Sequence, residues 1–531
     1  MRKFPGLASG RKWQVLLALV LSATIVQAQP TFPVNGIADP KQTTYAFIHA
    51  TVVVSPGTSL QNATLLVKEG KIIAAGTSVS IPRDAMLVDC KGKFIYPSFI
   101  DIYSDYGLPP IERATRGFNW GAPAQFNSNQ KGAYGWNQAI RTTVDAVTSF
   151  SADDAKAKPL RDIGFGTVLS HVKDGIARGT GVLATLSDEK ENKTILREQA
   201  AAFYSFSKGS STQSYPGSLM GTIALLRQTF LDAKWYQNNA EKEGVNLSLQ
   251  AFNKNRSLPQ VFDANDKWAD LRADNIGDEF GVQFIIKGGG NEYQRINDIK
   301  ASKATYILTL NYPQAMDVED PADARFVALS DMKHWELAPG NLAAFEKAGI
   351  PFCLSAADLK DSKQFLTNLR KALDYGLSET KALEALTKTP ATTLGVYNQV
   401  GSLEAGKLAN FLITSGPVFD DKTVILQNWV QGEQYLVNND GWSPVAGQYE
   451  LTLNNTNKYT LDVKSTSSAK LISKDTVDAK FSTDGKIVRI NFPESKGRRK
   501  ISVSAVSTTM AFGRARVMIL PGIKYCGRAS C

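Results

Sequence analysis

Three polar side chains alternate along one apolar segment of the chain. Asp101, Tyr103 and Asp105 occupy every second position in the run Phe-Ile-Asp-Ile-Tyr-Ser-Asp. In a β-strand, residues at this spacing point to the same face of the sheet. A carboxylate on that face is able to bind a hard metal ion, although a lone Asp105 is more commonly hydrogen-bonded and solvated. We therefore expect one face of the fold to present these polar side chains together.

Histidine is the usual ligand for divalent transition metals, and the chain contains three. His49 lies in a segment expected to form a small N-terminal sheet, which leaves His171 and His334. Together with Asp105 and Asp358 they supply two imidazoles and two carboxylates, enough donors for a divalent metal site. The alternative is that His171 packs in the core and His334 lies on a surface loop. Spacing does not decide, because the four residues come from separate segments.

Lys287 and Asp358 follow two other apolar runs and carry opposite charges. The Lys287 ammonium group is able to pair with Asp105 or Asp358 across the end of the sheet, where it would replace the charge of a metal ion. The alternative is a solvated lysine. Asp358 is either a functional carboxylate or the cap of a helix that begins near Asp361, a position that Asp commonly occupies. The sequence leaves both choices open.

These residues lie in a middle region, 93–395, that alternates apolar strand-like runs with amphipathic stretches. This alternation is typical of an α/β fold and favours a (β/α)8 TIM-like barrel over an open sheet, although periodicity alone does not separate the two. A barrel places its active site at the carboxyl ends of the strands, where the Gly-, Asn-, Gln- and Pro-rich loop 107–137 begins. The expected strands are Phe94–Tyr103, Gly166–Val172, Val182–Leu186, Val282–Lys287, Thr305–Leu310 and Phe352–Ala356. The expected helices are Thr142–Phe150, Pro216–Lys234, Glu292–Ala301, Asn341–Ala348, Ser362–Tyr375 and Ser378–Leu386.

Short apolar runs separated by turn residues flank this region. Because Tyr45–Val88 and residues 410–437 share the pattern, we expect one small antiparallel sheet assembled from both flanks. Further strand-like runs after residue 446 predict a β-rich segment. The expected order is a signal peptide at 1–28, the first part of the composite β domain at 29–92, the barrel at 93–395, the second part of the composite β domain at 396–446, and a β-rich module with an irregular basic tail at 447–531.

The two ends of the chain differ from its body. Residues 1–28 combine a basic start, an apolar run at Val15–Val26 and a small-residue cleavage site, a pattern typical of a secretory signal. A membrane anchor is the alternative, but this run of 12 residues is shorter than the roughly 20 that a spanning helix needs. We expect an exported protein, periplasmic or secreted, without a stable membrane span. Gly513–Cys531 lacks clear periodicity, and our hypothesis is that it is a non-native end from a truncated or shifted reading frame.

The net charge of +10 is concentrated at the ends. Residues 1–28 carry +4 and residues 491–531 carry +7, which leaves −1 for residues 29–490. A near-neutral body lacks the basic surface that phosphate backbones require, so we exclude nucleic acid as a partner.

Cysteine is sparse, and no zinc-ligand spacing is present. Cys90 and Cys353 lie in apolar, strand-like runs, where a buried thiol is expected. Cys526 and Cys531 are close enough along the chain to form a disulfide in an oxidising compartment.

Several ordered motifs resemble the amidohydrolase superfamily. Residues 96–101, Tyr-Pro-Ser-Phe-Ile-Asp, resemble the Pro-Gly-x-Ile-Asp that opens the first barrel strand of that family. Residues 378–395 resemble its closing helix, and Gly401–Asn410 resembles the turn that re-enters the small sheet. With Glu69–Gly76 and Asp89–Lys93, the resemblance spans roughly residues 45–440. The chain is most similar to the imidazolonepropionase-like branch, especially exported Bacteroidetes-type proteins, in which a second amidohydrolase domain typically follows.

The resemblance implies hydrolysis of C–N bonds in small amides or cyclic compounds. One or two divalent metals, zinc or another, activate water in such enzymes. The family's first strand carries the ligands His-x-His, but Tyr103 and Asp105 stand at those positions here. Asp101 matches a residue that in the family forms hydrogen bonds within the scaffold.

The remaining ligand positions are also changed. Lys287 and Leu310-Asn311 stand where later strands of the family carry histidine, while Asp358 matches the family's final metal ligand and proton shuttle. The sequence thus supports two hypotheses: a C–N hydrolase with an altered site and Asp358 as the catalytic residue, or a metal-free pseudoenzyme. The pseudoenzyme would bind a small molecule or support a partner amidohydrolase domain. The pocket residues expected in either case are Asp101, Tyr103, Asp105, His171, Lys287 and His334.

Overall fold

The computed structural model describes residues 43–112 and 123–438, together with seven strands between residues 447 and 518. The expected signal at 1–28, part of the loop at 107–137, Cys526 and Cys531 fall outside the described residues. Most of the tail at 513–531 does as well, except for strand β23 (Arg516–Met518). The predictions for these segments stay predictions.

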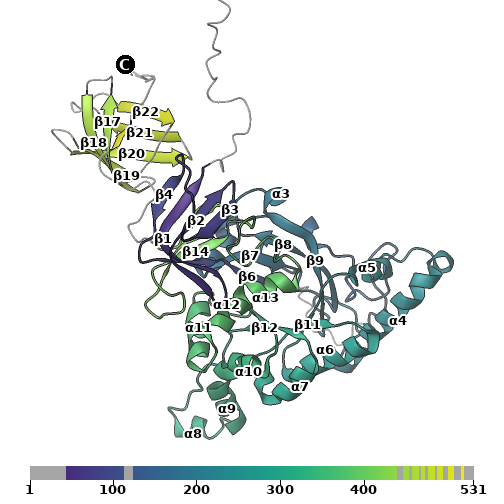
Figure 1. Cartoon of the computed structure of the whole chain (residues 1–531). Coiled ribbons are helices and arrows are strands. Elements are labelled where there is room, and N and C mark those ends of the chain that lie inside the picture. Colours follow the sequence, from purple (N-terminus) through teal and green to yellow (C-terminus); the bar gives the residue numbers. More distant parts are fainter. Residues whose placement is uncertain are drawn as a thin grey trace, which may run out of the picture.

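Eight strands form the central sheet of the middle region (Figure 1). Their order in space is β13-β12-β11-β10-β9-β8-β7-β6. Neighbouring strands are parallel except at β8, which is antiparallel to both β7 and β9. The strands are β6 (Phe99–Ser104), β7 (Phe165–Ser170), β8 (Ala177–Thr185), β9 (Ile195–Ser205), β10 (Gln260–Asp263), β11 (Phe284–Lys287), β12 (Thr305–Thr309) and β13 (Phe352–Ser355).

A short link explains the antiparallel strand. Only residues 171–176 separate β7 from β8, whereas a parallel crossover needs a dozen residues or more. At the two ends of the strand order, β6 and β13 are joined by side-chain hydrogen bonds: Ser355 Oγ donates to Asp101 Oδ1 at 2.7 Å, and the Ala356 N–H donates to Asp101 Oδ2 at 3.2 Å. The prediction of a mixed α/β fold is confirmed, while a closed (β/α)8 barrel stays a prediction.

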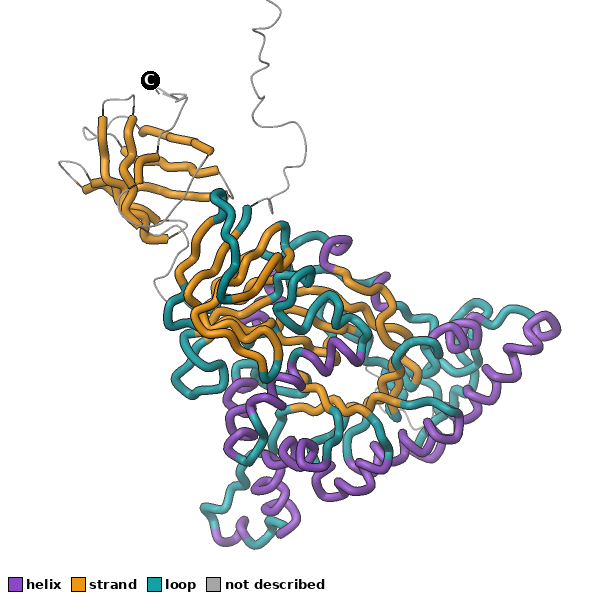
Figure 2. The backbone as a smooth tube through the Cα atoms, in the orientation of Figure 1, coloured by secondary structure: helices purple, strands orange, loops and turns teal. Residues whose placement is uncertain are grey.

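The helices lie mainly outside the strands of the central sheet (Figure 2). Helix α6 shows how local sequence sets its ends: the Asp266 side chain accepts from two N–H groups of the first turn, and Gly281 ends the helix with φ 66°. The α-helices are α2 (Asp154–Asp162), α3 (Glu191–Thr194), α4 (Leu219–Glu243), α5 (Leu247–Asn255), α6 (Lys267–Phe280), α7 (Ile296–Ala301), α8 (Pro321–Ala324), α9 (Leu329–Leu337), α10 (Asn341–Ala348), α11 (Gln364–Asp374), α12 (Glu379–Leu386) and α13 (Lys388–Thr393). The 3₁₀ helices of the described residues are η2 (Ala146–Thr148), η3 (Glu292–Arg295) and η4 (Ala338–Gly340).

The expected helix at Thr142–Phe150 is wrong. Only η2 forms there, because the segment lies along β8 and pairs with it between Asp145 and Thr180. Thr180 Oγ1 donates to Asp145 Oδ1 at 2.8 Å. A segment rich in Thr and Val has a low helix propensity, so contact with the sheet decides its conformation.

A second sheet is assembled from both flanks of the middle region. Its order is β16-β15-β14-β5-β1-β2-β3, with β4 paired to β1. The flanks meet where β5 and β14 pair antiparallel. The strands are β1 (Tyr45–Ser55), β2 (Thr58–Lys68), β3 (Lys71–Gly76), β4 (Met86–Asp89), β5 (Phe94–Pro97), β14 (Phe411–Thr414), β15 (Ile425–Val430) and β16 (Glu433–Leu436).

A fully buried amide joins this second sheet to the central one. Asn428 on β15 donates to the carbonyls of Arg161 (3.1 Å) and Phe165 (2.8 Å) and accepts from Ser98 Oγ (2.8 Å). We expect Asn428→Ala to lower the free energy of unfolding by about 1–3 kcal/mol, because buried polar groups lose their partners. Urea unfolding measures this loss. The exposed Asn238→Ala is the control, and an equal loss in both variants would contradict the bridging role.

The strands after residue 446 form a third sheet in the order β22-β21-β20-β19-β18-β17-β23. They are β17 (Gly447–Leu453), β18 (Asn457–Ser465), β19 (Ser468–Ile472), β20 (Thr476–Asp484), β21 (Ile487–Pro493), β22 (Lys500–Val506) and β23. Among the helices that the structure describes, none is both long and apolar enough to cross a membrane.

Candidate functional site

The candidate residues gather where the parallel strands of the central sheet end, which we call the site edge. Tyr103 lies at the end of β6, Lys287 ends β11 and Asp263 ends β10. Because β8 runs in the opposite direction, Arg178, near its start, reaches the same edge. Ligand sites of parallel α/β sheets typically form at this edge.

Lys287 is the centre of an ion-pair network at the site edge. Its side chain is almost buried, and its Nζ lies 2.5 Å from Asp358 Oδ2 and 3.6 Å from Asp263 Oδ1. The ammonium group also lies 5.5 Å from the centre of the Tyr103 ring. Of the alternatives for Lys287, the structure therefore shows the pair with Asp358, and neither a solvated lysine nor a pair with Asp105.

Asp358 does not cap the helix that follows it. Helix α11 begins at Gln364, and its N-cap position is held by Lys363, whose side chain makes no capping bond. Asp361 accepts from the Lys363 N–H instead. Asp358 has a φ of 65°, a left-handed conformation that is uncommon for residues other than glycine and that concentrates at functional sites. Its carboxylate is thus aimed at Lys287 rather than at a helix end.

Arg178 is a second buried cation beside Lys287. It donates to Asp263 Oδ2 at 2.9 Å and to Tyr103 Oη at 3.0 Å, and its Nε donates to the Gly175 carbonyl at 3.2 Å. The two cations therefore face two carboxylates, Asp263 and Asp358, and this cluster is balanced in charge. Tyr103, at a position where the family carries a ligand histidine, is held by a guanidinium group.

His171 is packed in the core beside the site. Its ring stacks on Phe203, with 3.7 Å between the ring centres, and meets the Tyr103 ring edge-on. Within the described residues neither ring nitrogen has a hydrogen-bond partner. Burial, together with the charges of Arg178 and Lys173, lowers the pKa of His171 well below its usual value. His171 is therefore neutral and packs against aromatic rings.

The two aspartates of β6 and its following turn have different surroundings. Asp101 is buried, accepts from Ser355 Oγ and from the N–H groups of Tyr103 and Ala356, and has a pKa that burial raises to about 6. Asp105 is exposed, with Lys173 Nζ at 3.6 Å. Asp101 thus holds β6 and β13 together, while Asp105 lies at the rim.

His334 is not among these residues. It lies on α9, where its Nδ1 is 3.1 Å from Tyr293 Oη and the two rings stack. It lines neither of the two cavities described below. Its expected place in a pocket stays a prediction.

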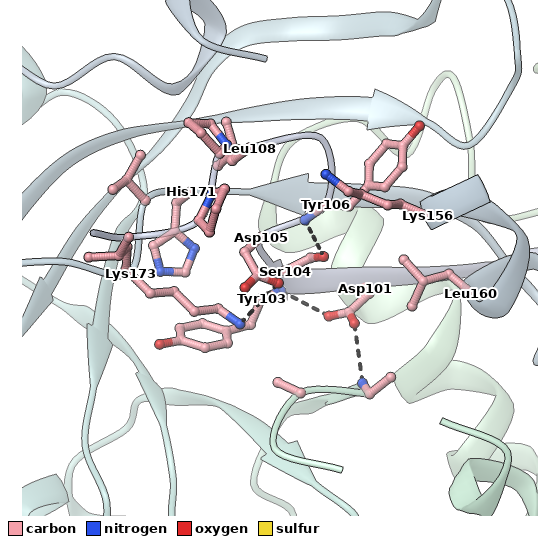
Figure 3. A pocket seen from close by; sticks show the side chains of 16 residues that line it. Asp101, Tyr103, Ser104, Asp105, Tyr106, Leu108, Lys156, Leu160, His171 and Lys173 are labelled. Carbon is pink, nitrogen blue, oxygen red and sulfur yellow. Dashed lines mark hydrogen bonds and ion pairs between the residues drawn. The ribbon is translucent and has the colours of Figure 1, made fainter. Parts of the chain in front are cut away.

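Two cavities open at the site edge. The β6 cavity, about 490 Å³, is lined by Asp101, Tyr103, Asp105 and His171 with neighbouring apolar residues and two lysines (Figure 3). The Lys287 cavity, about 410 Å³, is lined by Ser205, Phe206, Ser207, Asp263, Asn265, Lys287 and Asp358. The predicted pocket residues are thus divided between two spaces.

The donor set at the site edge does not fit the metal centre that the fold implies. Within residues 43–112, 123–438 and the described later strands, no group of three or more His, Cys, Asp or Glu side chains could hold a metal ion. The proposed set of His171, His334, Asp105 and Asp358 is therefore not brought together. Lys287 occupies the space beside Asp358, and an ammonium group has no lone pair to offer a metal.

The sequence reading missed Arg178, Asp263 and Lys173. Arg178 interrupts an apolar run, and Asp263 ends the short run Val261-Phe262 in the same manner that Lys287 ends its own strand. A charged residue that ends or interrupts an apolar run is the sequence pattern that indicates such residues. The sequence did not predict β10 or the first part of β8, so these two residues were not assigned to strand ends.

Known proteins resemble this chain in two ways. The Amidohydrolase family profile matches residues 341–439. Over 87 residues the chain is 33% identical to an imidazolonepropionase from Aeromonas hydrophila, which covers 15% of this chain and only one fifth (20%) of that protein. The crystal structure of an amidohydrolase from Thermotoga maritima MSB8 superposes with a TM-score of 0.58 at 23% identity, covering 73% of this chain and 99% of that one.

The family profile matches the C-terminal part of the middle region and the second part of the composite β domain, and the structural match extends over most of the chain. The motifs at both ends of the central sheet agree with them. Residues 341–439 are thus similar to the amidohydrolase family, and the fold of the chain is similar to that of an amidohydrolase.

Proposed function

We propose that this chain is a metal-free binding protein built on the amidohydrolase fold, and that it holds a small molecule at the site edge. The observation that carries the proposal is the position of Lys287 Nζ, 2.5 Å from Asp358 and 3.6 Å from Asp263. A positive charge of the protein itself supports these carboxylates, and it occupies the space in which a metal would have to bind. We further propose that the strands close into a barrel around this site.

The surroundings of Lys287 compensate the positive charge of its side chain. Lys287 is nearly buried, so a lone ammonium group would be costly, but two carboxylates and the face of Tyr103 compensate its charge. A divalent ion would have to displace Lys287 and would then find two carboxylates, Asp263 and Asp358, and no imidazole or thiolate among the residues that line this cavity. Family enzymes need a metal-activated water, and these residues provide no comparable route to one.

Elemental analysis tests the proposal. After incubation with Zn²⁺ or Mn²⁺ and desalting, we expect the purified chain to carry no metal above a blank. In Lys287→Ala, the unbalanced Asp358 should give detectable weak Mn²⁺ binding by calorimetry, because a carboxylate without its cation attracts another one. Lys173→Ala, which removes a lysine paired only with the exposed Asp105, should not. One tightly bound metal per unmodified chain, lost in Asp358→Asn, would refute the proposal.

The second candidate is hydrolysis of a C–N bond, which the similarity to an imidazolonepropionase favours. In that case Asp358 would be the catalytic residue. The same metal analysis separates the two candidates, because the hydrolase requires the bound metal that the binding protein lacks.

A further inference from the structure

The β6 cavity is more apolar than the Lys287 cavity. One wall consists of the turn after β6 together with a side chain of α2 and one residue after β7: Leu108, Pro109, Pro110, Ile111, Leu160 and Val172. The small side chains of Ala356 and Ala357 after β13 also line the cavity. A surface of this kind binds apolar groups by removing them from water.

Two lysines reach this cavity from different elements (Figure 3). Lys173 follows β7; its side chain is 26% exposed, and its Nζ lies 3.6 Å from Asp105 Oδ1 and 5.0 Å from the centre of the Tyr103 ring. Lys156 on α2 is 60% exposed, with Nζ 3.7 Å from Asp153 Oδ2. Both ion-pair distances exceed those of charge-assisted hydrogen bonds. The two ammonium groups therefore keep hydrogen-bonding capacity for a ligand.

The acidic residues of the cavity oppose these lysines only weakly. Asp101 already accepts three hydrogen bonds from the protein, and burial raises its pKa to about 6. The side chain of Asp105 is 72% exposed and so is well screened by water. His171 contributes no charge. An anion at the lysines thus meets little repulsion from the cavity itself.

We propose that the β6 cavity binds an apolar carboxylate, with its hydrocarbon part against the wall at Leu108 and Leu160 and its carboxylate at Lys173, with Lys156 at the rim. This inference deepens the proposed function by naming the ligand class, and it rests on that function because a metal at the site edge would bind a carboxylate itself. The volume of about 490 Å³ suits a compact molecule of this kind.

Calorimetry with phenylacetate and octanoate tests the proposal, with phenylacetamide and octanamide as uncharged counterparts. We expect the carboxylates to bind. The affinity of the amides should be lower by a factor of about ten or more, because a charge-assisted hydrogen bond is lost. A preference for octanoate or for phenylacetate shows whether the natural ligand is aliphatic or aromatic. Equal binding of acid and amide, or no binding of either acid, would overturn the proposal.

Variants locate the binding site. Lys173→Met should weaken carboxylate binding about tenfold and leave amide binding unchanged, while Leu160→Ser should weaken both. Lys158→Met is the matched control, since Lys158 lies on the same helix as Lys156 but pairs with Asp162 on the exposed side of α2. An equal effect of Lys158→Met would refute the site.

Repeating the titration with EDTA separates the two proposals. Binding that EDTA leaves intact and Lys173→Met weakens supports both the ligand class and the metal-free site. Binding that EDTA abolishes means that the carboxylate binds a metal, so the proposed function fails along with the inference. If neither acid binds and the chain carries no metal, the ligand class alone is wrong.

Discussion

Arg178→Met is expected to lower the free energy of unfolding by about 3–5 kcal/mol, the range found when one partner of a buried ion pair is removed. Arg178 is buried on β8 and donates to Asp263, Tyr103 and the Gly175 carbonyl. In the variant the cation that remains beside the Asp263 carboxylate is Lys287, at 3.6 Å. Removal of the guanidinium group therefore leaves Asp263 poorly compensated and Tyr103 Oη without its donor. Chemical unfolding, followed by fluorescence, measures the loss.

Two further variants show whether the loss comes from the pair. Arg178→Met combined with Asp263→Asn should recover much of the stability, because the second change removes the poorly compensated carboxylate. Arg227→Met breaks the exposed pair between Arg227 and Glu279 and should cost no more than about 1 kcal/mol. If the double variant is as unstable as Arg178→Met, packing rather than charge explains the result.

Asp270→Asn is expected to stabilise the chain at pH 8 and to have little effect at pH 5. Asp270 is fully buried on α6, and neither of its carboxyl oxygens has a hydrogen-bond partner in the described part of the chain. Burial, followed by the nearby charges of Glu292 and Asp266, raises its pKa well above the usual value, whereas Lys287 lowers it. A protonated Asp270 is able to donate to Glu292, which already accepts from Gly289 and Gly290.

The sign of the pH effect follows from the raised pKa. The folded chain holds a proton on Asp270 that the unfolded chain loses near pH 4, so the stabilising contribution of this group is complete below that pH. It is lost as the pH rises from there toward the folded pKa, by up to about 1.4 kcal/mol per pH unit. An amide carries no such proton. Asp270→Asn should therefore flatten the dependence of stability on pH over this window.

Thermal unfolding between pH 5 and pH 8 measures this difference. Asp84→Asn, an exposed change in the turn before β4, is the control and should shift the melting temperature by a similar small amount at every pH. If Asp270→Asn destabilises equally across the range, Asp270 is ionised in the folded chain and the assignment of a shared proton is wrong.

Local pattern was sufficient for much of the architecture. The apolar runs that end at Lys287 and Ser355 form β11 and β13, and the helices expected at 341–348 and 378–386 form α10 and α12 within one residue. The secondary structure of long or strongly patterned segments is predicted correctly because the local preference of the chain and its tertiary contacts agree. The helix predicted at 142–150 does not form, because the pairing of this segment with β8 outweighs its weak helical pattern.

The candidate site was predicted less completely, because its residues meet across strands. Asp101, Tyr103 and Asp105 line one cavity, but Ser104 and Tyr106 of the same segment line it as well, so strand alternation alone does not define its wall. The place of His334 in a pocket stays a prediction.

The sequence by itself determined the mixed α/β class and indicated the resemblance to amidohydrolases, because these depend on residue identity and local periodicity. Only the tertiary structure decided that Lys287 pairs with Asp358 rather than Asp105, and that Arg178 and Asp263 complete the network. Lys287 and Asp358 are 71 residues apart in the chain, and Arg178 and Asp263 are 85 residues apart. The order of strands in the sheet brings these residues together. The antiparallel direction of β8 follows from the short link between β7 and β8.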